Sequence, residues 1–151
     1  MIEYLDESLC QNRLTDEVAK LRKLQLADGS FAWWKGMEGS RYMTTEVAEM
    51  MVRLNRMVGV QQETKDMLTA ALRYLQRKAA AEVKDMKKEV EKKRNVRPSE
   101  LAIHYLYILS LDGRKLDPAA TYLLQNMAER TCEFTIYGKA RAAVVLASNG
   151  Q

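Results

Sequence analysis

The carboxylates and the single histidine are the side chains of this sequence with the greatest capacity for chemistry. Glu46 and Glu49 lie three residues apart, so both carboxylates share one face of a helix. A glycosidase could use such acids together with Asp28 or Glu38 from the preceding segment. Surface carboxylates at this density are common, and the chain contains no P-loop, GxGxxG or HExxH motif. We therefore expect no catalytic, cofactor-binding or metal-binding residues, and no enzyme activity.

The histidine and the two cysteines also fit structural roles. His104 lies in the most apolar segment, and catalysis would need a nucleophile or carboxylate partner to which the sequence does not point. We expect it to be a core residue with satisfied ring nitrogens. Cys10 and Cys132 lie far apart and belong to no CxxC or Cys/His cluster, which argues against a disulfide framework or a zinc site. We expect both to be buried as small apolar side chains.

The most distinctive segment is rich in glycine and aromatic residues and contains both tryptophans. Its candidate packing or ligand-contact residues are Asp28, Gly29, Phe31, Trp33, Trp34, Tyr42 and Thr44. The Asp-Gly pair permits a tight turn after a helix, and Phe31, Trp33 and Trp34 can then fold back into the seam between adjacent helices. We expect such packing. The alternative is a stacking platform for a sugar or peptide.

Helices must position these residues, because apolar side chains recur at helical spacing and no segment alternates long enough to predict a strand. Short connections between the helices indicate antiparallel hairpins. The helix expected over residues 62–94 is long, and we expect its last turns in solvent. The next helix should hold Pro98 in its first turn and be buried on several sides. The expected helices span about residues 13–27 (with a shorter turn ahead), 43–57, 62–94, 98–112, 117–127 and 134–149.

Composition fits one globular domain over residues 1–151, with 47% hydrophobic and 29% charged residues. The N-terminus is acidic rather than basic as in a signal peptide, and no stretch is apolar enough for a membrane span. Residues 77–97 hold nine basic and four acidic residues, a local charge of +5 within a total of +4. Because this segment lacks interleaved aromatics, we expect a solvated helix face and no contact with nucleic acid or membrane.

The loop motif resembles the helical, thioester-domain-like toroid of bacterial alpha-2-macroglobulin family proteins. In that family a helix ending Leu-x-x-Leu-Gln runs into Asp-Gly-Gly-Phe-x-Trp-Trp, and an aromatic-Leu-Thr step follows. The corresponding positions here are 21–25, 28–34 and 42–44, with Ser30 for the second glycine and Met43 for the leucine. Residues 102–109 look like the family's following repeat, so the resemblance covers most of the chain with one fairly specific motif.

The resemblance implies an all-α fold of about six helices, with antiparallel helical hairpins forming a partial alpha/alpha toroid. The family traps proteases, and many members form an internal thioester at a Cys-Gly-Glu-Gln motif. That motif is absent, since Cys10 is followed by Gln11-Asn12 and Cys132 by Glu133-Phe134. The resemblance therefore implies a non-catalytic, scaffolding part of a protease inhibitor in the periplasm or outside the cell.

Two other functions stay open from the sequence. One is a free-standing helical-repeat module that binds a protein or glycan through the Trp33/Trp34 loop. The other is a fragment of a toroid enzyme related to terpenoid cyclases or polysaccharide-degrading enzymes, although no DxDD-type cluster is visible. Because the chain stops just after a helix terminator, we expect a piece of a larger array. Its partners would be other domains of a parent chain, proteases through them, or a second copy through exposed helix edges.

Overall fold

The computed structural model describes residues 2–150, with side-chain surroundings from residue 7 onward, and this part of the chain is all-helical. Two isolated bridges, between Gln25 and Phe31 and between Phe31 and Ser40, are its only β-type pairings. The all-α prediction is thus confirmed. The helices are α1 (Ile2–Leu24), α2 (Arg41–Val58), α3 (Gln62–Glu91), α4 (Glu100–Asp112), α5 (Pro118–Ala128) and α6 (Ile136–Ser148), with a 3-10 turn at Thr131–Glu133 before α6.

Side-chain caps fix the start of most helices. At α5 the predicted cap is confirmed, because Asp117 Oδ1 accepts a hydrogen bond from the backbone N–H of Ala120 at 2.9 Å. At α4 the prediction that Pro98 lies in the first turn is wrong. Ser99 is the N-cap instead, and its hydroxyl accepts from the N–H of Ala102 at 3.1 Å. Pro98 therefore lies just outside the helix.

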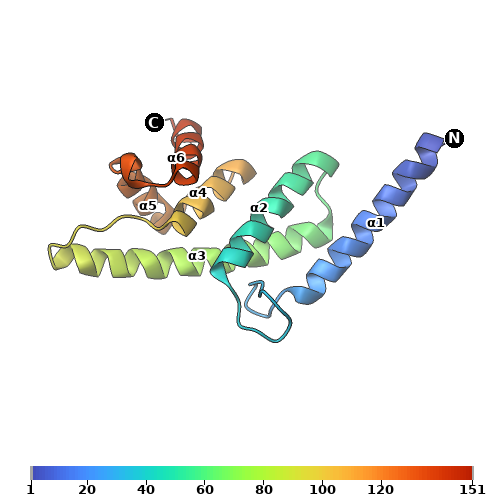
Figure 1. The fold of residues 1–151 in the computed structure, drawn as a ribbon, viewed down its shortest axis with the longest axis horizontal. Helices are drawn as coiled ribbons and strands as arrows, with labels where there is room; N and C mark the ends of the chain where they lie inside the picture. The colour runs from blue at the N-terminus through green and yellow to red at the C-terminus, as the bar shows by residue number, and fades with distance from the viewer. Residues whose placement is uncertain (1, 151) are drawn as a thin grey trace.

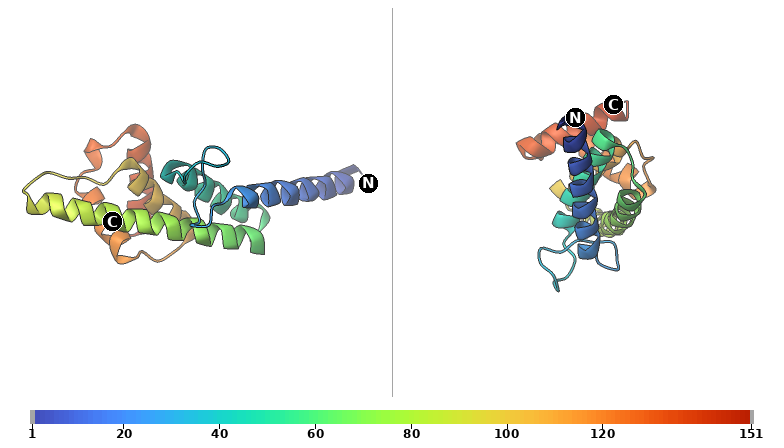
Figure 2. Two further views of the ribbon diagram at one scale, coloured as in Figure 1. Left: turned by 90° about the horizontal axis from the view of Figure 1, so that it is seen from below. Right: turned by 90° about the vertical axis from the view of Figure 1, so that its right-hand side faces the viewer.

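The six helices form two layers in which each helix packs beside its next-but-one neighbour. In the first layer α3 lies against α1 and α5, and in the second α4 lies against α2 and α6 (Figures 1 and 2). Hairpin contacts, such as that of α2 with α3, join the layers. This arrangement is compatible with part of an alpha/alpha toroid, whose closed curvature stays a prediction.

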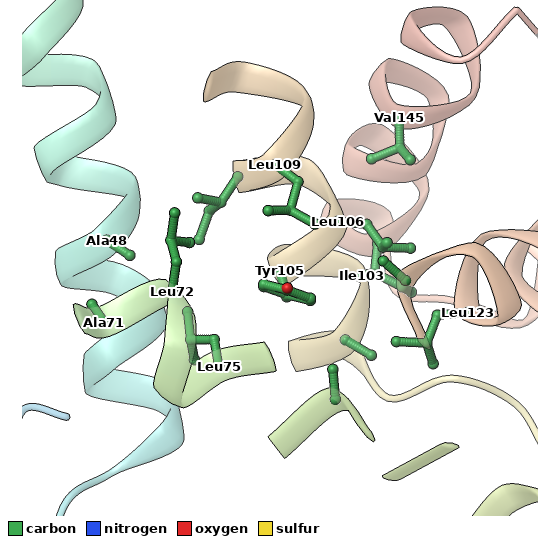
Figure 3. Packing of buried hydrophobic residues seen from close by; sticks show 14 of the residues in the cluster. Ala48, Ala71, Leu72, Leu75, Ile103, Tyr105, Leu106, Leu109, Leu123 and Val145 are labelled. Carbon is green, nitrogen blue, oxygen red and sulfur yellow. The ribbon is translucent and has the colours of Figure 1, made fainter. Parts of the chain in front are cut away.

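Helix α4 is the centre of the core, as its all-round apolar sequence predicts. Buried side chains point from it toward α2, α3, α5 and α6 (Figure 3). Ile103, Leu106 and Ile108 are fully buried, and the ring of Tyr105 is also enclosed. Such a helix has no polar face to present to water, so four neighbours must cover it.

Polar contacts at the helix ends hold α4 and α6 in register. The Glu82 carboxylate of α3 accepts hydrogen bonds from the N–H and hydroxyl of Ser99, at 2.7 and 2.9 Å. It also pairs with Arg41 of α2 at 2.6 Å. Glu100 in turn accepts from the N–H of Thr135, the N-cap of α6, at 2.9 Å. One carboxylate thus joins the starts of α2 and α4 to the middle of α3.

The expectation that both cysteines are buried is wrong. Cys10 and Cys132 are both exposed rather than buried. The reason for Cys10 is that α1 packs mainly on α3, and its N-terminal half projects beyond the other helices (Figure 1). The last turns of α3 were expected to project into solvent, and most of their residues, among them Lys87, Lys88 and Val90, are exposed. Within residues 84–91 only Met86 is buried, because α5 packs on this part of α3.

No helix within residues 2–150 combines the length and apolar character that crossing a membrane requires. The basic residues of the 77–97 segment are exposed along the outer face of α3 and the turn after it. Lys87 lies 5.0 Å from the ring centre of Tyr122 in α5. Lys92 and Arg94 both pair with Glu89. These contacts fit the predicted charged outer face.

Candidate functional site

The sequence motif around the tryptophans forms a loop that is fastened to α3 by Gln25. Its side-chain amide donates hydrogen bonds to two carbonyl oxygens, that of Gly29 at 3.0 Å and that of Met67 in α3 at 2.9 Å. Arg77, also in α3, donates to the carbonyl of Asp28 at 2.7 Å. The glutamine and the Asp-Gly turn of the motif therefore fix the loop to α3, a helix distant in sequence.

Within this turn, Gly29 is required by its surroundings. Its φ is +89°, in the left-handed region, and a Cβ built on it would lie 2.2 Å from the carbonyl oxygen of Ala70. The Asp28 carboxylate accepts from the N–H of Ser30 at 3.0 Å and from its hydroxyl at 2.5 Å. These bonds, and the positive charge of Arg77, lower the pKa of Asp28 although partial burial opposes them. Asp28 is thus a turn-forming carboxylate.

Phe31 and Thr44 bind the far side of the loop to α2. Phe31 is buried, and its N–H donates to the hydroxyl of Thr44 at 2.9 Å. That hydroxyl donates in turn to the carbonyl of Ser40 at 2.7 Å. Packing of Phe31 between helices is therefore as predicted, and Thr44 contributes a buried polar link.

The two tryptophans behave differently from the prediction that they fill the seam. Trp33 is 52% exposed and Trp34 is 71% exposed. The ring of Trp33 stacks on that of Tyr42, with centroids 5.7 Å apart and planes 8° from parallel, and Tyr42 is itself exposed. Of the three aromatic residues Phe31, Trp33 and Trp34, only Phe31 is buried, and the bulkier indoles stay on the surface.

A surface pocket adjoins the exposed indoles. Its volume is about 260 Å³, and Leu26 and Ala32 line it together with Trp33 and Trp34. Lys23 and Lys35 add two positive charges and no acidic residue lines it. An exposed aromatic surface on a loop held by buried hydrogen bonds can bind a partner with little loss of loop entropy. We call Trp33, Trp34 and Tyr42 the aromatic surface.

A second cluster, which the sequence did not reveal, joins the helices of the second layer. The imidazole of His104 in α4 is almost fully buried and its Nε2 makes a very short hydrogen bond with Glu49 of α2. Its Nδ1 lies 3.8 Å from Glu46. The predicted satisfied core histidine therefore has the carboxylate partners that sequence reasoning did not find, since residues 55 positions apart meet only through the packing of α2 on α4.

Two arginines and a tyrosine complete this cluster. Arg53 donates to Glu49 at 2.8 Å and to the hydroxyl of Tyr107 at 2.9 Å. Arg141 of α6 lies 3.8 Å from Glu49. The donor atoms of Glu46, Glu49 and His104 lie within 4.8 Å of one another, a spacing that a metal ion could bridge. The guanidinium groups already neutralise Glu49, so we interpret the cluster as an ion-pair network between helices.

The electrostatics of this network set the charge of its members. Burial lowers the pKa of His104, an effect that Arg141 increases and that Glu49 and Glu46 partly offset. Hydrogen bonds from Arg53 and His104 lower the pKa of Glu49 despite its burial. At neutral pH a neutral imidazole therefore donates to an ionised carboxylate. This arrangement stabilises the α2/α4 contact.

We predict that Gly29→Ala destabilises the protein more than Gly36→Ala. Both glycines have φ of +89°, but a Cβ added at Gly36 would meet no atom within 4 Å, whereas Gly29 abuts the Ala70 carbonyl. The Gly36 change should cost about 1 to 2 kcal/mol for the left-handed backbone alone, and the Gly29 change clearly more. Urea unfolding of both variants measures this difference. Equal losses would show that the loop does not press on α3.

We also predict that His104 makes stability fall as the pH decreases. Because its folded pKa lies below the ordinary value of 6.5, its contribution is complete above pH 6.5 and is lost toward the lower folded pKa. The pKa of Glu49 is lowered from 4.5, so Glu49 changes the pH dependence of stability only in a separate range below pH 4.5. Urea unfolding between pH 7.5 and 5 should therefore show this pH dependence of stability in the wild type and not in His104→Gln. A wild-type protein that gains stability on acidification would contradict the assignment.

Comparisons of the chain with models of known protein families, with characterised proteins and with solved structures find no match. The resemblance to the alpha-2-macroglobulin family therefore stays a prediction from the sequence. In the structure, Gln25, Asp28, Gly29 and Phe31 of that motif fasten the loop, whereas Trp33 and Trp34 are exposed. The motif thus divides into residues that hold the loop and residues that are exposed on its surface.

Proposed function

We propose that this chain is a non-catalytic helical domain of an alpha-2-macroglobulin-like protease inhibitor, in which it is an interaction and packing scaffold. The observation that carries the proposal is the aromatic surface, in which Trp33 and Trp34 are exposed on a firmly held loop. Large aromatic side chains on a surface are typical of protein interfaces, where tryptophan is often a main contributor to affinity. The resemblance of the loop motif to that family is the reason for proposing an inhibitor of this kind as the parent.

The partner that fits this proposal is another domain of the parent inhibitor. The aromatic surface would pack on that domain, and the parent would meet its proteases in the periplasm or outside the cell. The absence of a Cys-Gly-Glu-Gln motif in this chain supports a role without thioester chemistry. Cys10 on α1 and Cys132 on the 3-10 turn are exposed, but neither has the neighbouring residues that a thioester needs.

A second candidate is a free-standing module that binds a glycan or peptide. The pocket of about 260 Å³ beside Trp33 and Trp34 favours it, since exposed indoles can stack on a sugar ring. The two candidates use the same aromatic surface but differ in the molecule bound.

Binding to the remaining domains of the inhibitor, produced as a separate polypeptide, tests the proposal. Isothermal titration should give a complex, and Trp34→Ala should raise its dissociation constant by about 30-fold, the effect of a loss of roughly 2 kcal/mol at an interface. Tyr137→Ala is the matched control, because Tyr137 is an equally exposed aromatic on α6. Both variants should unfold at the wild-type temperature, since neither side chain is buried.

Intrinsic fluorescence distinguishes the two candidates, because Trp33 and Trp34 are the only tryptophans of the chain. A blue shift on adding the inhibitor domains supports the scaffold, whereas a blue shift with soluble oligosaccharides alone supports the module. If Trp34→Ala and Tyr137→Ala bind the inhibitor domains equally well, the aromatic surface is not the contact and the proposal is wrong.

A further inference from the structure

Helix α6 is apolar on two opposite faces, although only one of them is covered. Its inner face, with Gly138, Ala142 and Val145, is buried. The opposite face carries no charged residue and consists of Ile136, Ala140, Ala143, Val144 and Ala147, all of which are exposed. A helix that is apolar on both sides is expected to be buried on both sides. We call these five residues the outer face of α6.

A complementary apolar groove lies at the other end of the second layer, on α2. Two adjoining hollows share Met50 and Leu54. The larger, of about 390 Å³, lies between α1 and α2 and is lined mainly by aliphatic side chains, among them Leu14, Leu21 and Leu24. The smaller, of about 320 Å³, continues along α2. Their volumes fall in the range of about 300 to 1,000 Å³ that binding sites occupy. We call the two hollows the edge groove.

The outer face of α6 and the edge groove differ in the size of their side chains. The groove is bounded by long, flexible side chains such as Met50 and Leu24, whereas the outer face presents mainly alanine. Small residues let another helix approach closely, and methionine adapts to the surface that it meets. Within the chain, α6 already packs on α4 through small residues, Gly138 and Ala142. A helix on the edge groove would repeat this contact and extend the second layer.

The charges beside the two surfaces are also complementary. α6 contains Lys139 and Arg141 and no acidic residue. Lys139 is exposed and makes no ion pair with any residue of the described part of the chain. Glu46 borders the edge groove and is 41% exposed, whereas its neighbour Glu49 is already paired with Arg53. A helix seated in the groove would therefore gain from a lysine beside its apolar face.

From these apolar surfaces and their charges we propose that the edge groove binds the outer face of α6 from a second copy of this chain. The contact is heterologous, because two different surfaces meet, so it forms a closed ring of copies or a longer assembly. α2 and α6 lie on opposite sides of α4, so each copy offers both surfaces at once (Figure 3). This self-association is independent of the partner proposed for the aromatic surface.

Analytical ultracentrifugation of the whole chain over a range of concentrations tests the proposal. The wild type should form dimers or larger species. Ala143→Glu on α6 and Met50→Lys in the groove should each raise the dissociation constant by about tenfold or more, since each places a charge in an apolar contact. Ala81→Glu is the matched control, because Ala81 is an exposed alanine within α3. Glutamate keeps high helix propensity, so the folds should be retained, which circular dichroism verifies.

A mixture of the two variants gives the sharpest result. Ala143→Glu keeps an intact edge groove and Met50→Lys keeps an intact outer face of α6. In an equimolar mixture the groove of one variant should bind the outer face of the other and form a one-to-one dimer. If Ala143→Glu unfolds the chain, Ala147→Glu replaces it in the same experiment. A wild-type monomer at all concentrations would overturn the proposal and indicate that other chains cover these faces. Equal association of Ala143→Glu and Ala81→Glu, or no dimer in the mixture, would overturn it as well.

Discussion

The enclosure of α4 is the constraint on which the rest of the structure depends. Its sequence has no polar face, so its side chains leave water only when α2, α3, α5 and α6 surround it. The hydrophobic effect thereby fixes four helices around one. Hydrogen bonds from Ser99 to Glu82 and the contact of His104 with Glu49 then set its direction and register. The two layers follow from this central position.

The same constraint explains why the exposed apolar surfaces lie at the margins. The helices next to α4 bury the sides that face it. Within residues 2–150, no further helix covers α1, the side of α2 that faces away from α4, or the outer face of α6. The aromatic loop is different, because Gln25, Gly29 and Phe31 hold it firmly while Trp33 and Trp34 stay in solvent. The molecule thus has a well-packed centre and apolar edges.

Local signals in the sequence predicted the helices well and the contacts between them poorly. The apolar periodicity and Asp117-Pro118 located the helices within a few residues, except that α1 extends to Ile2 as one helix. The cluster of His104 and Glu49 could not be predicted, because it depends on which helix faces pair. Trp33 and Trp34 were misplaced for a related reason: aromatic residues beside a turn fit both a seam and a surface, and Phe31 takes the seam.

Amide hydrogen exchange of the whole chain, resolved by residue, tests the central position of α4 most directly. If α4 is the centre of the fold, amides of Ile103 to Leu109 should exchange only through global unfolding and be the slowest in the chain. Amides of α1 before Leu14, in the part that projects beyond the other helices, should exchange much faster. Exchange of α4 as fast as that at the start of α1 would contradict this, because the enclosure of α4 would then not hold the fold together.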